Sequence, residues 1–108
     1  MSLFIVVPKL PAAAMAIYPF ILIKKAAYKN DAVLINHEKI HHRQQLELLV
    51  FPFYFCYFLH YLFNLIKYKN HHQAYFNIAF EQEAFAQEYN HAYLKHRKLF
   101  AWFKWLKR

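Results

Sequence analysis

Glycine is absent from the 108 residues, and cysteine occurs only once, as Cys56. Loops that cradle phosphate groups need glycine, because their backbone must reach positive φ values and approach the ligand closely. The sequence therefore excludes a P-loop and a dinucleotide-binding fingerprint. A single cysteine cannot form an internal disulfide, so packing or a metal ion must hold the fold together. The length accommodates one domain, residues 1–108.

Acidic residues are scarce: six stand against 14 lysines and arginines, which gives a formal net charge of +8. All six lie within residues 31–88, whereas residues 1–30 and 89–108 carry only basic charges. Basic ends suit either nucleic acid or an anionic membrane surface. The sequence contains no recognised nucleic-acid-binding motif, and 59% of its residues are hydrophobic and 21% aromatic. We therefore expect a membrane surface as a partner, and no nucleic acid.

Formal charge is also missing from residues 48–66, a stretch of 19 residues. This is the length at which a bilayer span becomes possible. Pro52, His60 and Asn64 interrupt the apolar character, so we expect an intramembrane or interfacial segment rather than a straight span. Residues 1–25 have no basic residue before their first apolar run and contain three prolines, so we expect no cleaved signal peptide.

The N-terminal part predicts two short strands, at residues 3–7 and 16–23. Both stretches are rich in β-branched and aromatic residues and are bounded by proline or lysine. Pro19 would confine the second strand to the edge of a sheet, because proline cannot donate a hydrogen bond to the ladder.

Helices are expected after residue 30. The first covers residues 32–50, because Asn30 or Asp31 can cap its free N–H groups, and Pro52 would bend or break it. A second, apolar helix continues to residue 66.

Two further helices complete the predicted fold. Apolar residues recur at helical spacing through residues 72–94. Residues 95–108 predict a basic amphipathic helix, with an apolar face of Leu99, Trp102, Phe103 and Leu106 and with Lys98, Lys104, Lys107 and Arg108 directed away from it. The predicted fold class is therefore mainly α, with a short N-terminal β element and three to four helices.

An HExxH sequence, His37-Glu38-Lys39-Ile40-His41, lies inside the first predicted helix. Imidazoles at positions i and i+4 project from one face of a helix, one turn apart, and this separation suits two ligands of one Zn²⁺. Glu38 stands beside them, where it can take a proton from water. By composition alone this motif arises by chance in about one such sequence in forty.

A catalytic zinc ion needs a third protein ligand, and Glu81 on the third predicted helix can supply it. Ala84 follows at i+3, on the same helical face. A small residue there lets two helices approach closely, which a short carboxylate side chain needs to reach a metal on the first helix.

The pair of motifs, HEKIH at residues 37–41 and EQEA at residues 81–84, resembles the gluzincin metallopeptidases. The ExEA form and the intervening apolar segment are most similar to membrane-embedded peptidases of the prenyl-protein and heat-shock type. The length is similar to that of minigluzincins and of short bacterial HExxH proteins. The resemblance covers residues 31–94 and implies a zinc ion held by His37, His41 and Glu81, with Glu38 as general base.

One position departs from the pattern of the family, which usually has an aspartate four residues after the ligand glutamate. That aspartate orients a motif histidine, and this chain has Phe85 in its place. Orienting hydrogen bonds must then come from Glu88, from Asn77 or from a backbone carbonyl.

Two other metal sites compete for the same residues. Glu47 follows His37 by ten residues, as the third ligand does in a metzincin, but Gln44 occupies the position where that arrangement needs glycine. A di-iron site would use two ExxH pairs, Glu38 with His41 and Glu88 with His91. It lacks ligands, because residues 48–66 contain no carboxylate.

The order of the motifs also constrains the fold, since His37 precedes residues 48–66 and Glu81 follows them. A single bilayer crossing would put the ligands on opposite sides, so a break at Pro52 must fold the chain back. We expect a zinc-dependent peptidase at the cytoplasmic face of a membrane, with an extended peptide paired to the strand near residues 21–23. The alternative is a non-catalytic zinc-binding or membrane-surface protein that retains the HExxH site.

Overall fold

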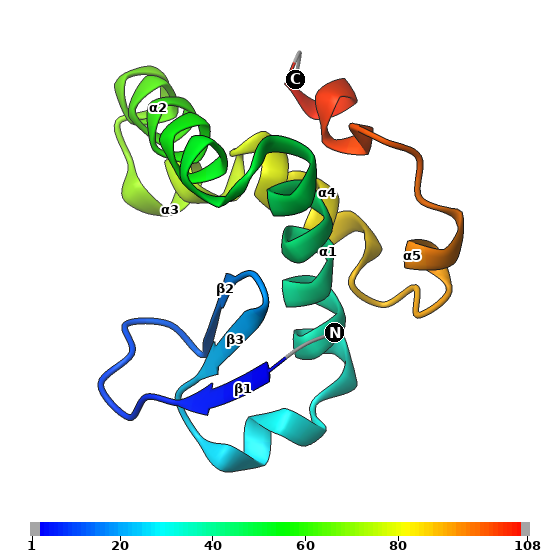
Figure 1. Ribbon diagram of the computed structural model, residues 1–108. Coiled ribbons are helices and arrows are strands. Elements are labelled where there is room, and N and C mark those ends of the chain that lie inside the picture. Colours follow the sequence, from blue (N-terminus) through cyan, green and yellow to red (C-terminus); the bar gives the residue numbers. More distant parts are fainter. Residues whose placement is uncertain (1–2, 107–108) are drawn as a thin grey trace.

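The computed structural model describes residues 3–106. Mainly helical, the chain has a small N-terminal sheet, which confirms the predicted fold class (Figure 1). Its elements are the strands β1 (Leu3–Val6), β2 (Ala14–Ile17) and β3 (Phe20–Ile23), the helices α1 (Ala32–Leu48), α2 (Val50–Tyr68), α3 (His71–Phe76), α4 (Ala79–Gln87) and α5 (Tyr93–His96), and the 3₁₀ helices η1 (Ala26–Asn30) and η2 (Ala101–Trp105).

The sheet has the strand order β1-β3-β2, with β1 parallel and β2 antiparallel to β3. The single strand expected at residues 16–23 is instead the end of β2, a turn at Tyr18 and Pro19, and β3. Pro19 lies in that turn, where it owes no hydrogen bond to the ladder. The expectation of an edge strand near residues 21–23 is wrong, because β3 pairs on both sides and β1 and β2 form the two edges.

Helix α1 begins where the sequence indicates, since the Asp31 side chain accepts a hydrogen bond from the Leu34 N–H at 3.1 Å. It ends at Leu49, which has a φ of 68°, and the chain turns by 108° into α2. The break therefore precedes Pro52, which lies in the first turn of α2, where N–H groups need no partner within the helix. In residues 3–106 no helix alone meets the length and hydropathy of a membrane span, whereas the bent pair α1 and α2 does so together.

The third predicted helix, residues 72–94, is wrong as a continuous element and is divided into α3, α4 and α5. Asn77 ends α3, and its side-chain amide donates to the Gln73 carbonyl at 2.8 Å. Ile78 is extended, and α4 begins after it. Such side-chain bonds to the backbone compete with the helical ladder, and apolar periodicity does not register them.

The predicted amphipathic helix at residues 95–108 is also wrong. After α5 the chain unwinds and forms only η2, with Trp102 and Trp105 buried. Trp102 packs on Phe80 at a ring distance of 4.9 Å, so one of the four residues of the expected lipid-facing stripe belongs to the core. Leu99, Phe103 and Leu106 are exposed, and residues 107 and 108 lie outside the described part of the chain.

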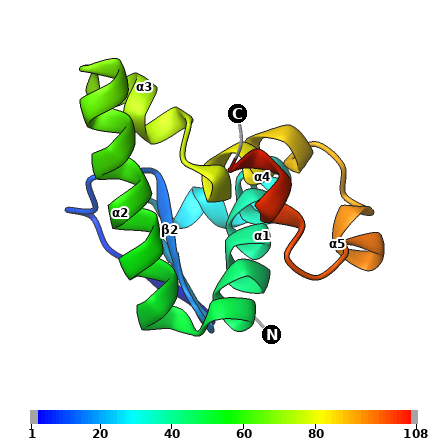
Figure 2. The same ribbon diagram turned by 90° about the horizontal axis from the view of Figure 1, so that it is seen from above.

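Two clusters of buried side chains fix these elements. One joins the sheet to α1 through Ala14, Ile21, Ile23 and Ile35. The other joins α2, α4 and η2 through Phe53, Ile78, Phe80 and Trp102. Seen from above, α1 runs between the sheet and α4, and α2 forms one side of the molecule (Figure 2). The HExxH motif therefore lies where the two clusters meet.

Candidate metal centre

Helices α1 and α4 bring together the three residues that the sequence singled out as metal ligands. His37 and His41 are one turn apart on α1, and Glu81 lies in the first turn of α4. All three are buried. Ala84 is completely buried, in keeping with its expected role as a small residue that allows close helix contact.

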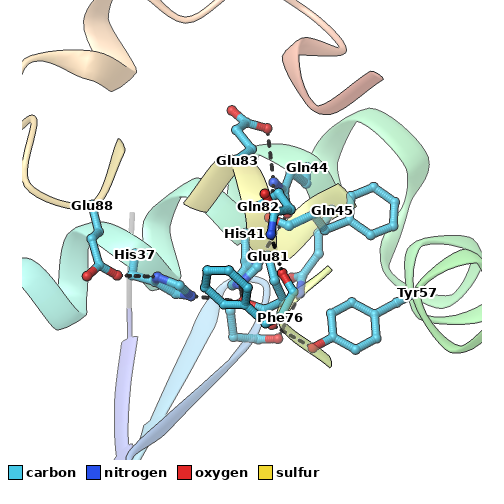
Figure 3. A network of polar contacts seen from close by, with 12 residues as sticks. His37, His41, Gln44, Gln45, Tyr57, Phe76, Glu81, Gln82, Glu83 and Glu88 are labelled. Carbon is cyan, nitrogen blue, oxygen red and sulfur yellow. Dashed lines mark hydrogen bonds and ion pairs between the residues drawn. The ribbon is translucent and has the colours of Figure 1, made fainter. Parts of the chain in front are cut away.

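The ligand atoms converge on one point. Nε2 of His37 and Nε2 of His41 each lie 3.0 Å from Oε1 of Glu81 (Figure 3). One ligand atom from each residue falls within 4.8 Å of the other two. His37, His41 and Glu81 thus form a buried group that can hold a metal ion.

Hydrogen bonds on the far sides of the two rings fix their orientation. Nδ1 of His37 lies 2.7 Å from Oε1 of Glu88, and Nδ1 of His41 lies 2.7 Å from Oε1 of Gln44. Both oxygens are acceptors, so each Nδ1 carries a proton and donates it. In a neutral imidazole the lone pair is then on Nε2, the atom directed at Glu81. This donor set is the one that a metal bound by two histidines and a carboxylate requires.

Glu88 therefore supplies the orienting bond that the family usually takes from an aspartate, as one of the sequence-based alternatives proposed. Phe85 packs against the His37 ring instead, at a ring distance of 4.7 Å. Asn77 has no part in the site, because its side chain bonds to Gln73. His91 is exposed, and with Glu88 held by His37 the second ExxH pair of the di-iron alternative does not form a site.

The amide of Gln44 is itself held in place, which determines which end faces His41. Its Nε2 donates to the Phe80 carbonyl and to Oε1 of Glu83, both at 3.0 Å. The carbonyl oxygen is therefore left for His41. Gln44 is completely buried. From the sequence, Gln44 served only to argue against a metzincin site, which needs glycine at that position. Its position, three residues after His41 on one helical face, was the available signal.

Behind Gln44 lies a buried cluster of charges that ties the C-terminal segment to the site. Arg97 donates to both carboxylate oxygens of Glu83 and to both oxygens of Glu47. Glu47 also accepts from the backbone N–H of Phe100 and from the indole N–H of Trp102. Glu47 is thus an anchor for the C-terminal segment, and the metzincin alternative, in which it is the third ligand, is wrong.

Charge and burial shift the pKa values of the site in opposite directions. Burial alone would lower the pKa of His41, but the Glu81 carboxylate outweighs it and raises that pKa to about 9. Burial opposes ionisation of Glu81, but the charge of His41 and hydrogen bonds from both histidines prevail and hold its pKa well below the usual range. Burial raises the pKa of Glu38 despite both histidines. The metal-free site is therefore an ion pair of His41 and Glu81 beside a carboxyl group that takes up protons readily.

A cavity of about 250 Å³ opens beside these residues and is lined by Glu38, His41 and Glu81. Within residues 3–106 the Glu38 carboxylate has no hydrogen-bond partner, so it faces the cavity unengaged. Tyrosines form much of the opposite wall. Tyr57 donates to Oε2 of Glu81 at 2.5 Å, and Tyr54 and Tyr75 line the cavity beside it. None of these three tyrosines was predicted to lie at the site, because a tyrosine among apolar residues can face either the core or the surface.

The edge strand β2 forms a further wall of the cavity through Ala14, Met15 and Ala16. Gln45 of α1 fixes this strand, because its amide donates to the Ala16 carbonyl at 2.7 Å and its oxygen accepts from the Tyr18 N–H at 2.7 Å. The strand that borders the cavity is thus β2 and not β3, and its Ala16 carbonyl is bound by side chains of α1 and α2.

Comparisons of the chain with protein-family models, with curated proteins and with solved structures give no match. The buried group of His37, His41 and Glu81 is accordingly the feature that bears on function.

Proposed function

We propose that this chain is a zinc-dependent peptidase in which His37, His41 and Glu81 bind the metal and Glu38 is the general base. The convergence of two Nε2 atoms on one carboxylate oxygen, with both Nδ1 atoms anchored, is the observation that carries the proposal. A zinc ion fits this set, because nitrogen and oxygen donors suit it and three protein ligands leave a position open for chemistry. When bound, zinc supplies Lewis-acid chemistry, polarising a carbonyl and making water acidic.

Glu38 has the position and the acidity that a general base needs. Its carboxylate faces the cavity beside His41 and Glu81, and burial raises its pKa toward the range useful for proton transfer. In hydrolysis the water oxygen forms a bond to the peptide carbonyl carbon while Glu38 takes a proton from that water. The C–N bond then breaks, and Glu38 delivers the proton to the leaving nitrogen.

The walls of the cavity suit an extended peptide. An edge strand can add a peptide as a further strand, and the edge strand β2 lines the cavity through Ala14 and Ala16. The Ala16 carbonyl is already bound by Gln45 and Tyr54, so a peptide would pair at Ala14. The hydroxyl group of Tyr75 lines the cavity and can donate to the oxygen of the substrate carbonyl, whereas the Tyr57 hydroxyl already donates to Glu81. Small alanine side chains leave room for the side chains of the substrate.

The test combines zinc content with hydrolysis of a fluorogenic peptide library. Wild type should bind close to one zinc ion per chain, and His41→Ala and Glu81→Ala should each lose it. Glu38→Gln should keep zinc and lose hydrolysis, because it removes the base and no ligand. Lys39→Ala, an exposed neighbour on the same helix, is the matched control and should keep both. Undiminished zinc in both His41→Ala and Glu81→Ala would show that the ligands are wrong.

A non-catalytic zinc-binding protein is the second candidate. The ligands are supported by buried polar contacts that extend through Gln44 and Glu83 to Arg97, so a metal would stabilise the whole fold. Stoichiometric zinc in a wild type that cleaves no member of the library would favour this function over peptidase activity.

A further inference from the structure

The outward side of α2 exposes large apolar side chains along its whole length. In Figure 2 this helix lies at the left of the molecule, and α1, α4 and α5 all lie to its right. Seven of its large apolar residues are exposed: Phe51 (88%), Phe55 (65%), Phe58 (57%), Leu59 (48%), Leu62 (37%), Phe63 (62%) and Ile66 (78%). Leu46 and Leu49, at the corner between α1 and α2, extend the same surface. We call these nine residues the α2 apolar face.

Five polar side chains of α2 turn the other way, whereas Lys67, near its C-terminal end, is exposed. Each of five makes a hydrogen bond to another element of the fold: Tyr54 to the Ala16 carbonyl, Tyr57 to Glu81, His60 to the Ala79 N–H, Tyr61 to His71 and Asn64 to the Ala74 carbonyl. A helix on a surface in water shows the opposite sorting, with polar groups outward and apolar groups inward. Hydrocarbon outward and satisfied polar groups inward is the sorting that contact with lipid requires.

The charges of the chain select the kind of lipid. Four of the six acidic residues are engaged at the candidate metal centre or with Arg97, Glu38 faces the cavity, and Asp31 caps α1. Within residues 3–106 Arg97 is the one lysine or arginine in an ion pair, and the other eleven are exposed. Arg43 precedes the α2 apolar face, and Lys67 and Lys69 follow it. A basic surface around an apolar face complements an anionic membrane.

We propose that the α2 apolar face docks this chain on the surface of an anionic lipid bilayer. The helix lies along the interface, with the phenylalanines of the α2 apolar face among the acyl chains and with Tyr54, Tyr57 and Tyr61 bonded to the protein. The membrane contact that the sequence assigned to the C-terminal segment thus moves to α2, because Trp102 of that segment is buried and α2 exposes the longer apolar surface. Tyr54 and Tyr57 line the cavity from the inner side of the same helix. On the proposed peptidase function, this favours peptides that are themselves anchored in the membrane.

Cys56 provides a probe at this face, because it is exposed on α2 and is the sole cysteine of the chain. The full chain, labelled there with an environment-sensitive dye, is mixed with vesicles of phosphatidylcholine and phosphatidylglycerol. The emission should shift to the blue and the protein should sediment with the vesicles, less so in high salt and less so with phosphatidylcholine alone. A dye at residue 98, in the variant Cys56→Ser with Lys98→Cys, should shift much less.

Substitutions separate this face from the C-terminal one. The double variant Phe55→Ser, Phe63→Ser should weaken vesicle partitioning by about a hundredfold, since each phenylalanine removed from lipid costs about tenfold. The matched control Leu99→Ser, Phe103→Ser removes equally exposed residues and should bind nearly as wild type. Equal binding by wild type and the Phe55, Phe63 variant would overturn the proposal. The proposal would also be overturned if the wild type formed a dimer and did not bind vesicles, and if the Phe55, Phe63 variant were a monomer. A second copy of the chain would then cover the α2 apolar face. Glu38→Gln should bind vesicles as wild type does, so this result stands apart from the test of peptidase activity.

Discussion

Replacing Glu88 with alanine tests whether its hydrogen bond to His37 prepares the metal centre. Glu88 holds Nδ1 of His37 at 2.7 Å, and its side chain is 17% exposed. Loss of such an outer partner typically weakens metal binding by about 10- to 100-fold, or about 1.4 to 2.7 kcal/mol. Water can reach Nδ1 once the carboxylate is gone, and Phe85 still packs on the ring. We therefore expect a loss near the lower end, about tenfold.

The assay is competition for zinc against a fluorescent chelator near neutral pH. Glu88→Gln is the matched control, because its amide oxygen can still accept the Nδ1–H of His37, and it should lose less affinity than Glu88→Ala. His37→Ala, which removes a ligand, sets the scale of complete loss. Wild-type affinity in Glu88→Ala would refute the reasoning, because the orientation of His37 would then not depend on this bond.

Two further predictions concern pH and stability. His41, with its pKa raised to about 9, stabilises the metal-free fold fully below its ordinary value of 6.5, so that this stability should fall as pH rises toward 9. Zinc affinity should rise over the same pH range, by up to about tenfold per pH unit, because the metal displaces the His41 proton. Urea titrations at each pH measure the stability, and competition with a chelator at each pH measures the zinc affinity. If stability and affinity both rose or both fell with pH, the ion pair of His41 and Glu81 would be contradicted. Arg97→Ala should destabilise the fold by about 3 to 5 kcal/mol in urea, because it leaves two buried carboxylates unpaired, whereas Lys98→Ala should change stability by less than about 0.5 kcal/mol. An Arg97→Ala chain as stable as wild type would show that the cluster with Glu83 and Glu47 contributes nothing.

The meeting of His37, His41 and Glu81 in one buried group could be predicted from the sequence, because the spacing of the two histidines is local. Two histidines at i and i+4 share a face wherever the chain is helical, and the Asp31 cap and the long polar-apolar pattern make α1 a helix. Glu81 could be predicted because Ala84 marks a face that permits close helix contact. Glu88 was one of three choices for the orienting bond, and the turn after α4 decided among them.

Other elements could not be predicted, because their causes lie in tertiary contacts. The division of residues 72–94 depends on Asn77, whose bond to Gln73 leaves no trace in the apolar periodicity. Trp102 is apolar enough for lipid and for a core, and it is buried because Glu47 accepts its indole N–H and Phe80 packs on its ring. Which of these partners would be present depends on where α1 and α4 bring them, and spacing along residues 95–108 does not contain that information.

Several of the few acidic residues are buried and in contact with positively charged groups. Glu83 and Glu81 are buried, and burial of a carboxylate is costly unless an opposite charge compensates it. For Glu83 the compensating charge is Arg97, which is permanent. For Glu81 it is a proton on His41, which can be exchanged for a metal ion without moving either side chain far, because the Nε2 atoms already face the carboxylate. Among the buried contacts of residues 3–106, the contact of Glu81 with the two histidines is therefore one at which a metal ion could replace a proton.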